Sequence, residues 1–318
     1  MQTRDVTDEN TAQQKGCVSS FAELVALRQP AQSINLHNRR AVSTTSNGAF
    51  LSNFRGAGMD FEEVRPYQPG DDLRYLDWRV TARRDKPHTK VFREERERPV
   101  IVLVDNRSGM HFGTRTAFKS VIAAQVAALL SWSAVDTGDR IGGVIFTEEE
   151  QTVLQPRARQ HGALLLLNQL VSAPAPQATQ YAPATDAAFV QALRAVRRVS
   201  RPNSLLFVIS DFAGMSKSIE QELLQLNVHQ QITSIMIYDQ LEAQLPVQGT
   251  YAFTDGNARC QLNTNREVCT QYQHSFDEKR LHLQTWHHQN GLSWLTLRTD
   301  EDVVKVLHQA WRARGVRL

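Results

Sequence analysis

Two carboxylates follow apolar, β-branched runs and are the side chains best placed to do chemistry. Asp105 ends the run "PVIVLVD", and Asp211 follows the run "LLFVIS". Runs of this kind predict strands that are buried on both faces of a parallel sheet. In an open parallel sheet, ligands bind outside the carboxyl ends of the strands, where the strand order reverses. We therefore expect both aspartates at one edge of one sheet.

Hydroxyl groups and a third carboxylate are expected at the same edge. Ser108 follows the first aspartate, and the segment "PATDAAF" places Thr185 and Asp186 where a helix begins. Carboxylates, hydroxyls and waters form the octahedral oxygen shell that Mg²⁺ prefers. The candidate metal ligands are therefore Asp105, Ser108, Thr185 and Asp211.

The elements that position these side chains alternate between strand and helix from residue 99 onward. The predicted strands are "PVIVLVD", "RIGGVIF", "NSLLFVISDF", "ITSIMIYD" and "LSWLTLRT". Amphipathic or apolar helices separate them, the last of them capped by Asp300, and residues 147–181 are expected as a looser stretch around one helix. Such alternation predicts an α/β fold: a doubly wound, mostly parallel sheet with helices on both faces.

The chain divides into three regions. Residues 1–16 are polar and predict a disordered tail. Residues 17–98 are expected to form a smaller accessory module, in which a helix over "FAELVALR" precedes a charged segment with some β structure. Residues 99–318 are expected to form the α/β domain, with a hairpin inserted near 250–263 because Asp255-Gly256 is a strong turn signal.

Composition excludes several classes of protein. The formal net charge is only +3, which does not favour nucleic acid as a partner. No apolar stretch is long enough to span a bilayer, and the polar N-terminus is unlike a signal peptide, so we expect a cytoplasmic protein. The cysteines, Cys17, Cys260 and Cys269, form no C-x-x-C pair and indicate a reducing compartment. The helix with His282, His287 and His288 lacks zinc spacing and is expected to be a solvated face.

The charged segment is nearly neutral despite its many arginines. From residue 55 to residue 98 it holds eleven Arg or Lys and ten Asp or Glu, interleaved with aromatic residues. This balance predicts a folded module in which arginine and carboxylate side chains pair. Two interpretations stay open: the module docks on the α/β domain and supports its sheet, or it forms a protein-docking surface. The arginines of that surface would be Arg74, Arg79, Arg83 and Arg84.

Two family resemblances follow from these segments. The order Asp105, "GDRIGGVIF", Thr185, "ISDF" resembles a von Willebrand factor A domain, whose metal-ion-dependent adhesion site begins with D-x-S-x-S. The segment "DFEEVRPYQPGDDLRYLDWRVTARRDKPHTKVFREE" resembles the signature of the DUF58 family, in which such a domain follows this segment. The resemblance runs from about residue 39 to the C-terminus and fits the short form without membrane helices.

The DUF58 resemblance implies a function as well as a fold. Members of that family are commonly encoded beside MoxR-type AAA+ ATPases. The resemblance therefore implies a non-enzymatic adaptor or assembly factor that works with such an ATPase in protein maturation or remodelling. The ATP would be hydrolysed by the partner, and the client protein is not defined by the sequence.

The chain departs from the adhesion motif at both serines. Arg107 and Gly109 stand at those positions, which removes two hydroxyl ligands and adds a guanidinium. Three states of the site are open: a working Mg²⁺ site, a degenerate site in which Arg107 pairs with Asp105 or Asp211, or an altered site that receives a partner's carboxylate. The adaptor is expected to engage its partners at this carboxyl edge through a degenerate adhesion site, with or without Mg²⁺, and Arg107 and Asp186 are among the expected partner-binding residues.

Two rival functions come from other classes. Asp105, Asp186 and Asp211 would hold Mg²⁺ in a phosphoryl hydrolase, but no nucleophile or base stands out and fold likeness cannot supply one. The basic C-terminus "RARGVRL" would serve a scaffold for self-assembly or nucleic-acid binding. Motifs for nucleotide or dinucleotide binding are absent from the sequence.

Overall fold

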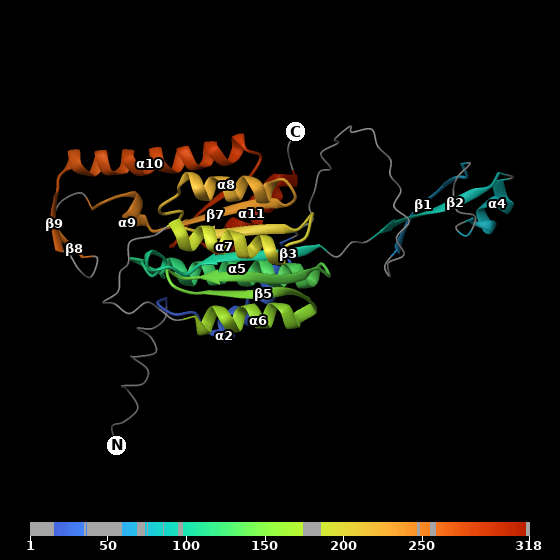
Figure 1. Ribbon diagram of the computed structural model, residues 1–318, viewed down its shortest axis with the longest axis horizontal. Coiled ribbons are helices and arrows are strands. Elements are labelled where there is room, and N and C mark those ends of the chain that lie inside the picture. The colour runs from blue at the N-terminus through green and yellow to red at the C-terminus, as the bar shows by residue number, and fades with distance from the viewer. Residues whose placement is uncertain are drawn as a thin grey trace, which may run out of the picture. The chain divides into compact units, whose positions relative to one another are not determined.

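Figure 1 shows the computed structural model of the chain. The structure describes residues 16–34, 36, 59–68, 74, 76–84, 86–94, 98–173, 186–246, 249–254 and 259–315. The chain forms two compact units, one of residues 1–40 with 98–318 and one of residues 41–97. The predicted tail lies almost entirely outside the described residues.

The larger unit contains a six-stranded sheet, which confirms the predicted α/β fold. In spatial order its strands are β10 (Ser293–Arg298), β7 (Gln231–Tyr238), β6 (Leu205–Ser210), β3 (Pro99–Asp105), β4 (Arg140–Phe146) and β5 (Gln151–Ala158). All neighbours pair in parallel except β4 and β5. The strand order reverses at β3, which pairs with β4 on one side and with β6 on the other. This reversal is where a doubly wound sheet is expected to carry its site.

Helices cover both faces of the sheet (Figure 1). Val102 and Val104 of β3 pack in one core cluster, whereas Ile101 and Leu103 pack in the other, as alternation along a strand requires. The first cluster is covered by α2 (Phe21–Ala26), α3 (Arg28–Ala31), α5 (Lys119–Asp136), α6 (Arg159–Ser172) and α11 (Val303–Gly315). The second is covered by α7 (Asp186–Val199), α8 (Lys217–Asn227) and α10 (Arg266–Gln289).

The N-terminal helix lies in the sheet-bearing unit, whereas we had grouped it with the charged module. Trp132 of α5 donates its indole N–H to the carbonyl oxygen of Leu24 at 3.0 Å. The hydroxyl of Ser133 donates to the carbonyl oxygen of Ile34 at 2.6 Å. In each of these two hydrogen bonds the donor and the acceptor are about a hundred residues apart in the sequence. Local sequence patterns therefore could not reveal them.

Strand β5 lies where we expected a looser stretch. Its side chains are exposed or half-buried, because it is an edge strand that pairs only with β4. Pro156 within it cannot donate to a neighbour, which an edge strand tolerates. The polar sequence therefore concealed a strand that half-faces solvent.

Among its described residues, the smaller unit contains a two-stranded antiparallel sheet and the helix α4. Strand β1 (Met59–Pro66) pairs antiparallel with β2 (His88–Glu94), and α4 (Trp78–Arg84) lies between them in the chain. The charged segment was expected to contain some β structure, and β2 agrees with that expectation. Strand β1 was not foreseen, because its side chains do not show a clean alternation of apolar and polar residues.

The C-terminal elements agree with the sequence in kind and differ in detail. Strands β8 (Gly249–Thr254) and β9 (Arg259–Thr264) form the predicted hairpin, and its turn lies outside the described residues. Helix α10 spans Arg266–Gln289 and contains the three histidines that were expected on one helix. The expected cap of α11, Asp300, is not the cap: Asp302 accepts from the backbone N–H of Lys305 at 3.1 Å.

His287 contradicts the expectation of a solvated histidine face. It is fully buried on α10, where its ring packs 4.4 Å from that of Trp294 and 5.7 Å from that of Phe212, between ring centroids. Its Nδ1 lies 2.7 Å from the carbonyl oxygen of Leu283. Burial lowers the pKa of His287 to about 4, despite the opposing effect of the Leu283 carbonyl.

We predict that His287 makes the protein acid-sensitive. Its pKa is lower in the folded chain than in the unfolded chain, so stability is full above pH 6.5 and is lost as the pH falls towards 4. The loss should reach about 3 kcal/mol, since one pKa unit corresponds to about 1.4 kcal/mol. Urea unfolding at several pH values should show a flatter profile for His287→Phe, with exposed His288→Phe as control. Identical profiles for both variants and the native chain would refute this role.

Candidate functional site

Asp105 and Arg107 form a buried ion pair at the carboxyl end of β3. Asp105 is completely buried and Arg107 is 3% exposed. The guanidinium is bidentate: Nε lies 2.9 Å from Oδ1 of Asp105, and Nη2 lies 2.6 Å from Oδ2. The backbone N–H of Arg107 also donates to Oδ1 at 3.0 Å. The sequence left open whether Arg107 pairs with Asp105 or with Asp211. In the structure its bidentate partner is Asp105.

Asp211 lies beside this pair and has a cation of its own. Its Oδ1 is 3.9 Å from Nη2 of Arg107, so both strand-end carboxylates face one guanidinium. Its Oδ2 accepts from Nζ of Lys119 at 2.9 Å. Lys119 is buried at the start of α5 and also donates to Oε1 of Glu242 at 2.7 Å. Glu242 belongs to the short helix α9 (Gln240–Ala243). Negative and positive side chains thus alternate along this edge, in the order Asp105, Arg107, Asp211, Lys119 and Glu242.

Two serines complete the network. Ser210, the last residue of β6, donates its hydroxyl to Oδ2 of Asp105 at 2.6 Å. Ser108 does not point its hydroxyl at Asp105: both its hydroxyl and its backbone N–H donate to Oε1 of Glu148, at 2.6 Å and 2.7 Å. Glu148 lies in the turn between β4 and β5. The network therefore fastens the loop after β3 to the loop after β4.

Electrostatics keep the two cations charged. Burial disfavours the charge on Arg107 and on Lys119, but their carboxylate neighbours outweigh it and raise the pKa of each above its ordinary value. Burial alone would raise the pKa of Asp211; Lys119 reverses this effect and holds that pKa below its usual range. Complete burial raises the pKa of Asp105, and Arg107 opposes that rise.

Aromatic rings support the guanidinium. The Cζ atom of Arg107 lies 5.5 Å from the ring centroid of Phe146 and 5.4 Å from that of Phe189. Contacts of this kind stabilise a cation, and more strongly when it is desolvated. Nη1 of Arg107 is buried and has no hydrogen-bond partner among the described residues. The two rings therefore stabilise a guanidinium that burial has removed from water.

The donor set does not fit Mg²⁺. Both oxygens of Asp105 are engaged by Arg107, and one oxygen of Asp211 is engaged by Lys119. Two like unit charges about 4 Å apart repel by about 4 kcal/mol at an effective dielectric constant near 20, and a divalent ion would double this cost. Within the described residues, no group of three His, Cys, Asp or Glu side chains is arranged to hold a metal.

The other expected site residues are distributed over both units. Thr185 lies outside the described residues, and Asp186 is half-buried at the first position of α7. Arg74, Arg79 and Arg83 are exposed in the smaller unit, where α4 also contains Arg84. The structure therefore brings together Asp105, Arg107 and Asp211, with Ser108 turned towards Glu148.

Four residues of the network were missed from the sequence. Ser210 directly precedes Asp211, so its place at a strand end could have been recognised. Lys119, Glu148 and Glu242 carry no such signal, because a charged residue at the start of a helix or in a turn is normally solvated. Their role depends on which loops meet at the edge of the sheet.

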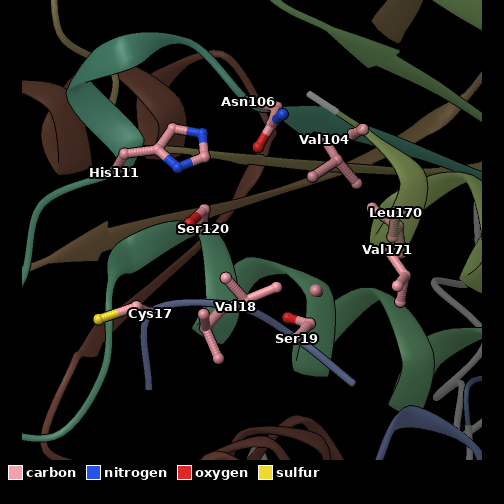
Figure 2. Close-up of a pocket in the computed structure, with 12 residues that line it drawn as sticks. Cys17, Val18, Ser19, Val104, Asn106, His111, Ser120, Leu170 and Val171 are labelled. Atoms are coloured by element: carbon pink, nitrogen blue, oxygen red, sulfur yellow. The ribbon is translucent and has the colours of Figure 1, made fainter. Parts of the chain in front are cut away.

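A pocket opens at the same edge, next to the end of β3 (Figure 2). Its empty volume is about 470 Å³, part of it open to solvent. Polar groups of Asn106, His111 and Ser120 contribute to its wall, and Nε2 of His111 has no hydrogen-bond partner among the described residues. The remaining wall is mainly apolar and includes Val18 and Val104. It suits an apolar side chain with a polar group at its end.

The chain is similar in sequence to a known protein family. The family model described as "Protein of unknown function DUF58" matches residues 63–282. An uncharacterized protein of Mycobacterium tuberculosis is 28% identical over 230 residues, which cover 71% of this chain and 70% of that protein.

Solved structures are similar to the chain as well. The conserved hypothetical protein BatB from Bacteroides thetaiotaomicron is 16% identical, with 69% of this chain and 98% of that chain covered and a TM-score of 0.42. A von Willebrand factor type A protein from Catenulispora acidiphila is 11% identical, with 72% and 43% covered and a TM-score of 0.32.

We predict that Arg107→Met destabilises the fold by about 3–5 kcal/mol, because it leaves a buried carboxylate without its counter-charge. The loss should shrink as the pH falls, since protonation of Asp105 removes the unpaired charge. The double variant Asp105→Asn/Arg107→Met should be more stable than Arg107→Met alone. Urea unfolding at two pH values measures these differences, with exposed Lys217→Met as control. A small, pH-independent loss would show that the pair is not the main stabilising contact.

Proposed function

Because the chain belongs to the DUF58 family, we propose that it is a non-enzymatic protein-binding adaptor that works with a MoxR-type AAA+ ATPase. The ATPase would hydrolyse ATP while this chain recruits or orients a protein that is matured or remodelled. The fold suggests a protein-interaction role, in keeping with this assignment. One observation carries the proposal: the chain supplies its own cations, Arg107 and Lys119, at the edge where a metal would otherwise organise the loops.

The buried network fixes the shape of the surface and does not itself contact the partner. Asp105, Arg107 and Asp211 are buried, so an incoming side chain meets the loops that they hold. These loops follow β3, β4 and β6. The pocket beside β3 offers such a side chain an apolar cavity with polar groups in its wall, and Val18 at its wall is 57% exposed.

The same geometry disfavours a magnesium-dependent phosphoryl hydrolase. That reaction needs Asp105 and Asp211 as metal ligands, and both carboxylates are already paired with cations of the chain. A hydrolase would also need an activated nucleophile within reach of the metal. Adaptor function needs neither, only a surface of fixed shape.

Among the described residues, none of the helices combines the length and the apolar character of a membrane span.

We predict that divalent metal leaves the stability of the protein unchanged. Thermal unfolding in Mg²⁺, in Mn²⁺ and in EDTA should give the same Tm, because the two cations of the chain already neutralise the carboxylates. A rise of Tm in Mg²⁺ that is lost in Asp105→Asn would show a working metal site and would overturn this part of the proposal.

Binding to the ATPase tests the adaptor function directly. The chain and the MoxR-type ATPase from the same genome should associate when both are purified, as measured by biolayer interferometry with and without ATP. Val18→Asp should weaken binding about tenfold or more, since it puts a charge at the wall of the pocket. Val228→Asp is the matched control, because Val228 is 72% exposed and lies at the end of α8. Equal binding by both variants would exclude this edge as the contact, and no binding by the native chain would refute the ATPase partnership.

A further inference from the structure

We infer that the exposed face of α4, in the smaller unit, is a second docking surface and that it binds an acidic segment of a partner protein. The face consists of Trp78, Arg79, Ala82 and Arg83, which we call the α4 stripe. All four are exposed, and the indole of Trp78 is the most exposed of the large aromatic side chains in the part of the chain that the structure describes, at 72%.

Helix geometry makes these residues one continuous surface. Successive residues of an α-helix are about 100° apart, so Trp78, Ala82, Arg79 and Arg83 fall in that order within an arc of about 140°. Val80 and Thr81, which lie on the other side of the helix, are half-buried. The small side chain of Ala82 leaves the indole of Trp78 uncovered, and the arginines stand beside it.

The helix that presents the stripe is anchored at its start. Oδ1 of Asp77 accepts from the backbone N–H groups of Arg79 and Val80, at 3.0 Å and 3.1 Å, and so caps the helix. The backbone N–H of Asp77 donates to the carbonyl oxygen of His88 at 2.8 Å. The N–H of His88 donates to the hydroxyl of Thr81 at 3.0 Å. These bonds tie α4 to β2, so the stripe is held in place before any partner arrives.

The chemistry of the stripe calls for an acidic partner. Helix α4 contains three arginines and no acidic residue. Arg79 and Arg83 stand four residues apart, a spacing at which like charges destabilise a helix. A carboxylate between them would remove this repulsion and form charge-assisted hydrogen bonds. Tryptophan and arginine are also the residues that dominate binding energy at protein interfaces.

A nucleic acid fits the stripe less well than a protein does. Phosphate binding needs an excess of cations over a broad surface. The segment from residue 55 to residue 98 holds eleven Arg or Lys and ten Asp or Glu, so its positive charge is confined to a small area. A segment of acidic and apolar side chains matches both the arginines and Trp78.

Peptide binding by the full chain tests this surface without reference to the ATPase. The probe is a short fluorescein-labelled peptide of glutamates interrupted by phenylalanines, measured by fluorescence anisotropy at low and high salt. We expect binding that weakens with salt. Trp78→Ala and Arg79→Glu/Arg83→Glu should each weaken it about tenfold or more. The matched control, Arg201→Glu/Lys217→Glu, reverses two exposed charges of the larger unit and should bind as the native chain does.

Several outcomes would overturn the proposal. These are no binding of the acidic peptide, equal losses in the control variant, or tighter binding of a lysine-for-glutamate peptide. Tighter binding of an oligothymidylate that is lost in the same variants would make the stripe a nucleic-acid surface instead. Acrylamide should quench the fluorescence of an accessible tryptophan in the native chain, and this accessible fraction should be missing in Trp78→Phe. If the two chains are quenched equally, the chain itself covers the stripe.

The ATPase separates this proposal from the adaptor function. If the ATPase binds the native chain and the α4 variants equally, while the peptide discriminates between them, the stripe serves another acidic partner and both proposals stand. If the peptide fails and the ATPase binds, only the stripe is overturned. If the peptide behaves as expected and the ATPase does not bind, only the ATPase partnership fails.

Discussion

Two carboxylates at the ends of adjacent parallel strands cannot both stay charged in a protein interior without counter-charges. In this chain Arg107 neutralises Asp105 and Lys119 neutralises Asp211, with the guanidinium within 4 Å of both aspartates. Removing either cation would leave a buried charge unpaired, which costs several kcal/mol. The loops after β3 and β6, and the start of α5, are thereby locked to one another.

Hydrogen bonds connect the ion-paired residues to the neighbouring loops. Glu148 holds the loop after β3 through Ser108, and Glu242 holds Lys119 from the side of α9. Asp239, at the end of β7, accepts from the hydroxyls of Thr114 and Thr299, both at 2.6 Å. Among the described residues, polar and charged side chains thus connect the loops along this edge of the sheet.

This organisation separates structural from recognition roles. At this edge, the charged groups with the strongest interactions are buried, whereas the pocket beside β3 is partly open to solvent. A metal in such a site has two roles, because it holds the loops and also offers an open coordination position. In the adaptor that we propose, the guanidinium and the ammonium group perform the first role only, and a partner is recognised by the shape of the surface.

The sequence by itself determined the fold class and the position of the key aspartates. Continuous β-branched runs can be stable only when buried on both faces, which requires a parallel sheet covered by helices, and Asp105 and Asp211 fall at the strand ends for the same reason. The replacement of a motif serine by Arg107 was also visible, together with the two partners available to it.

Only the tertiary structure decided which partner Arg107 takes and which residues complete the site. Lys119, Glu148 and Glu242 reach the edge from a helix start, a turn and a short helix far apart in the sequence, and no local pattern marks them. Distant contacts also decide the burial of His287, which packs against Trp294 and Phe212. The place of the N-terminal helix depends in the same way on its contact with Trp132. The local pattern of residues indicates which secondary structure a segment tends to form. The environment of a polar side chain depends instead on packing between segments that are far apart in the sequence, so a local pattern does not predict it.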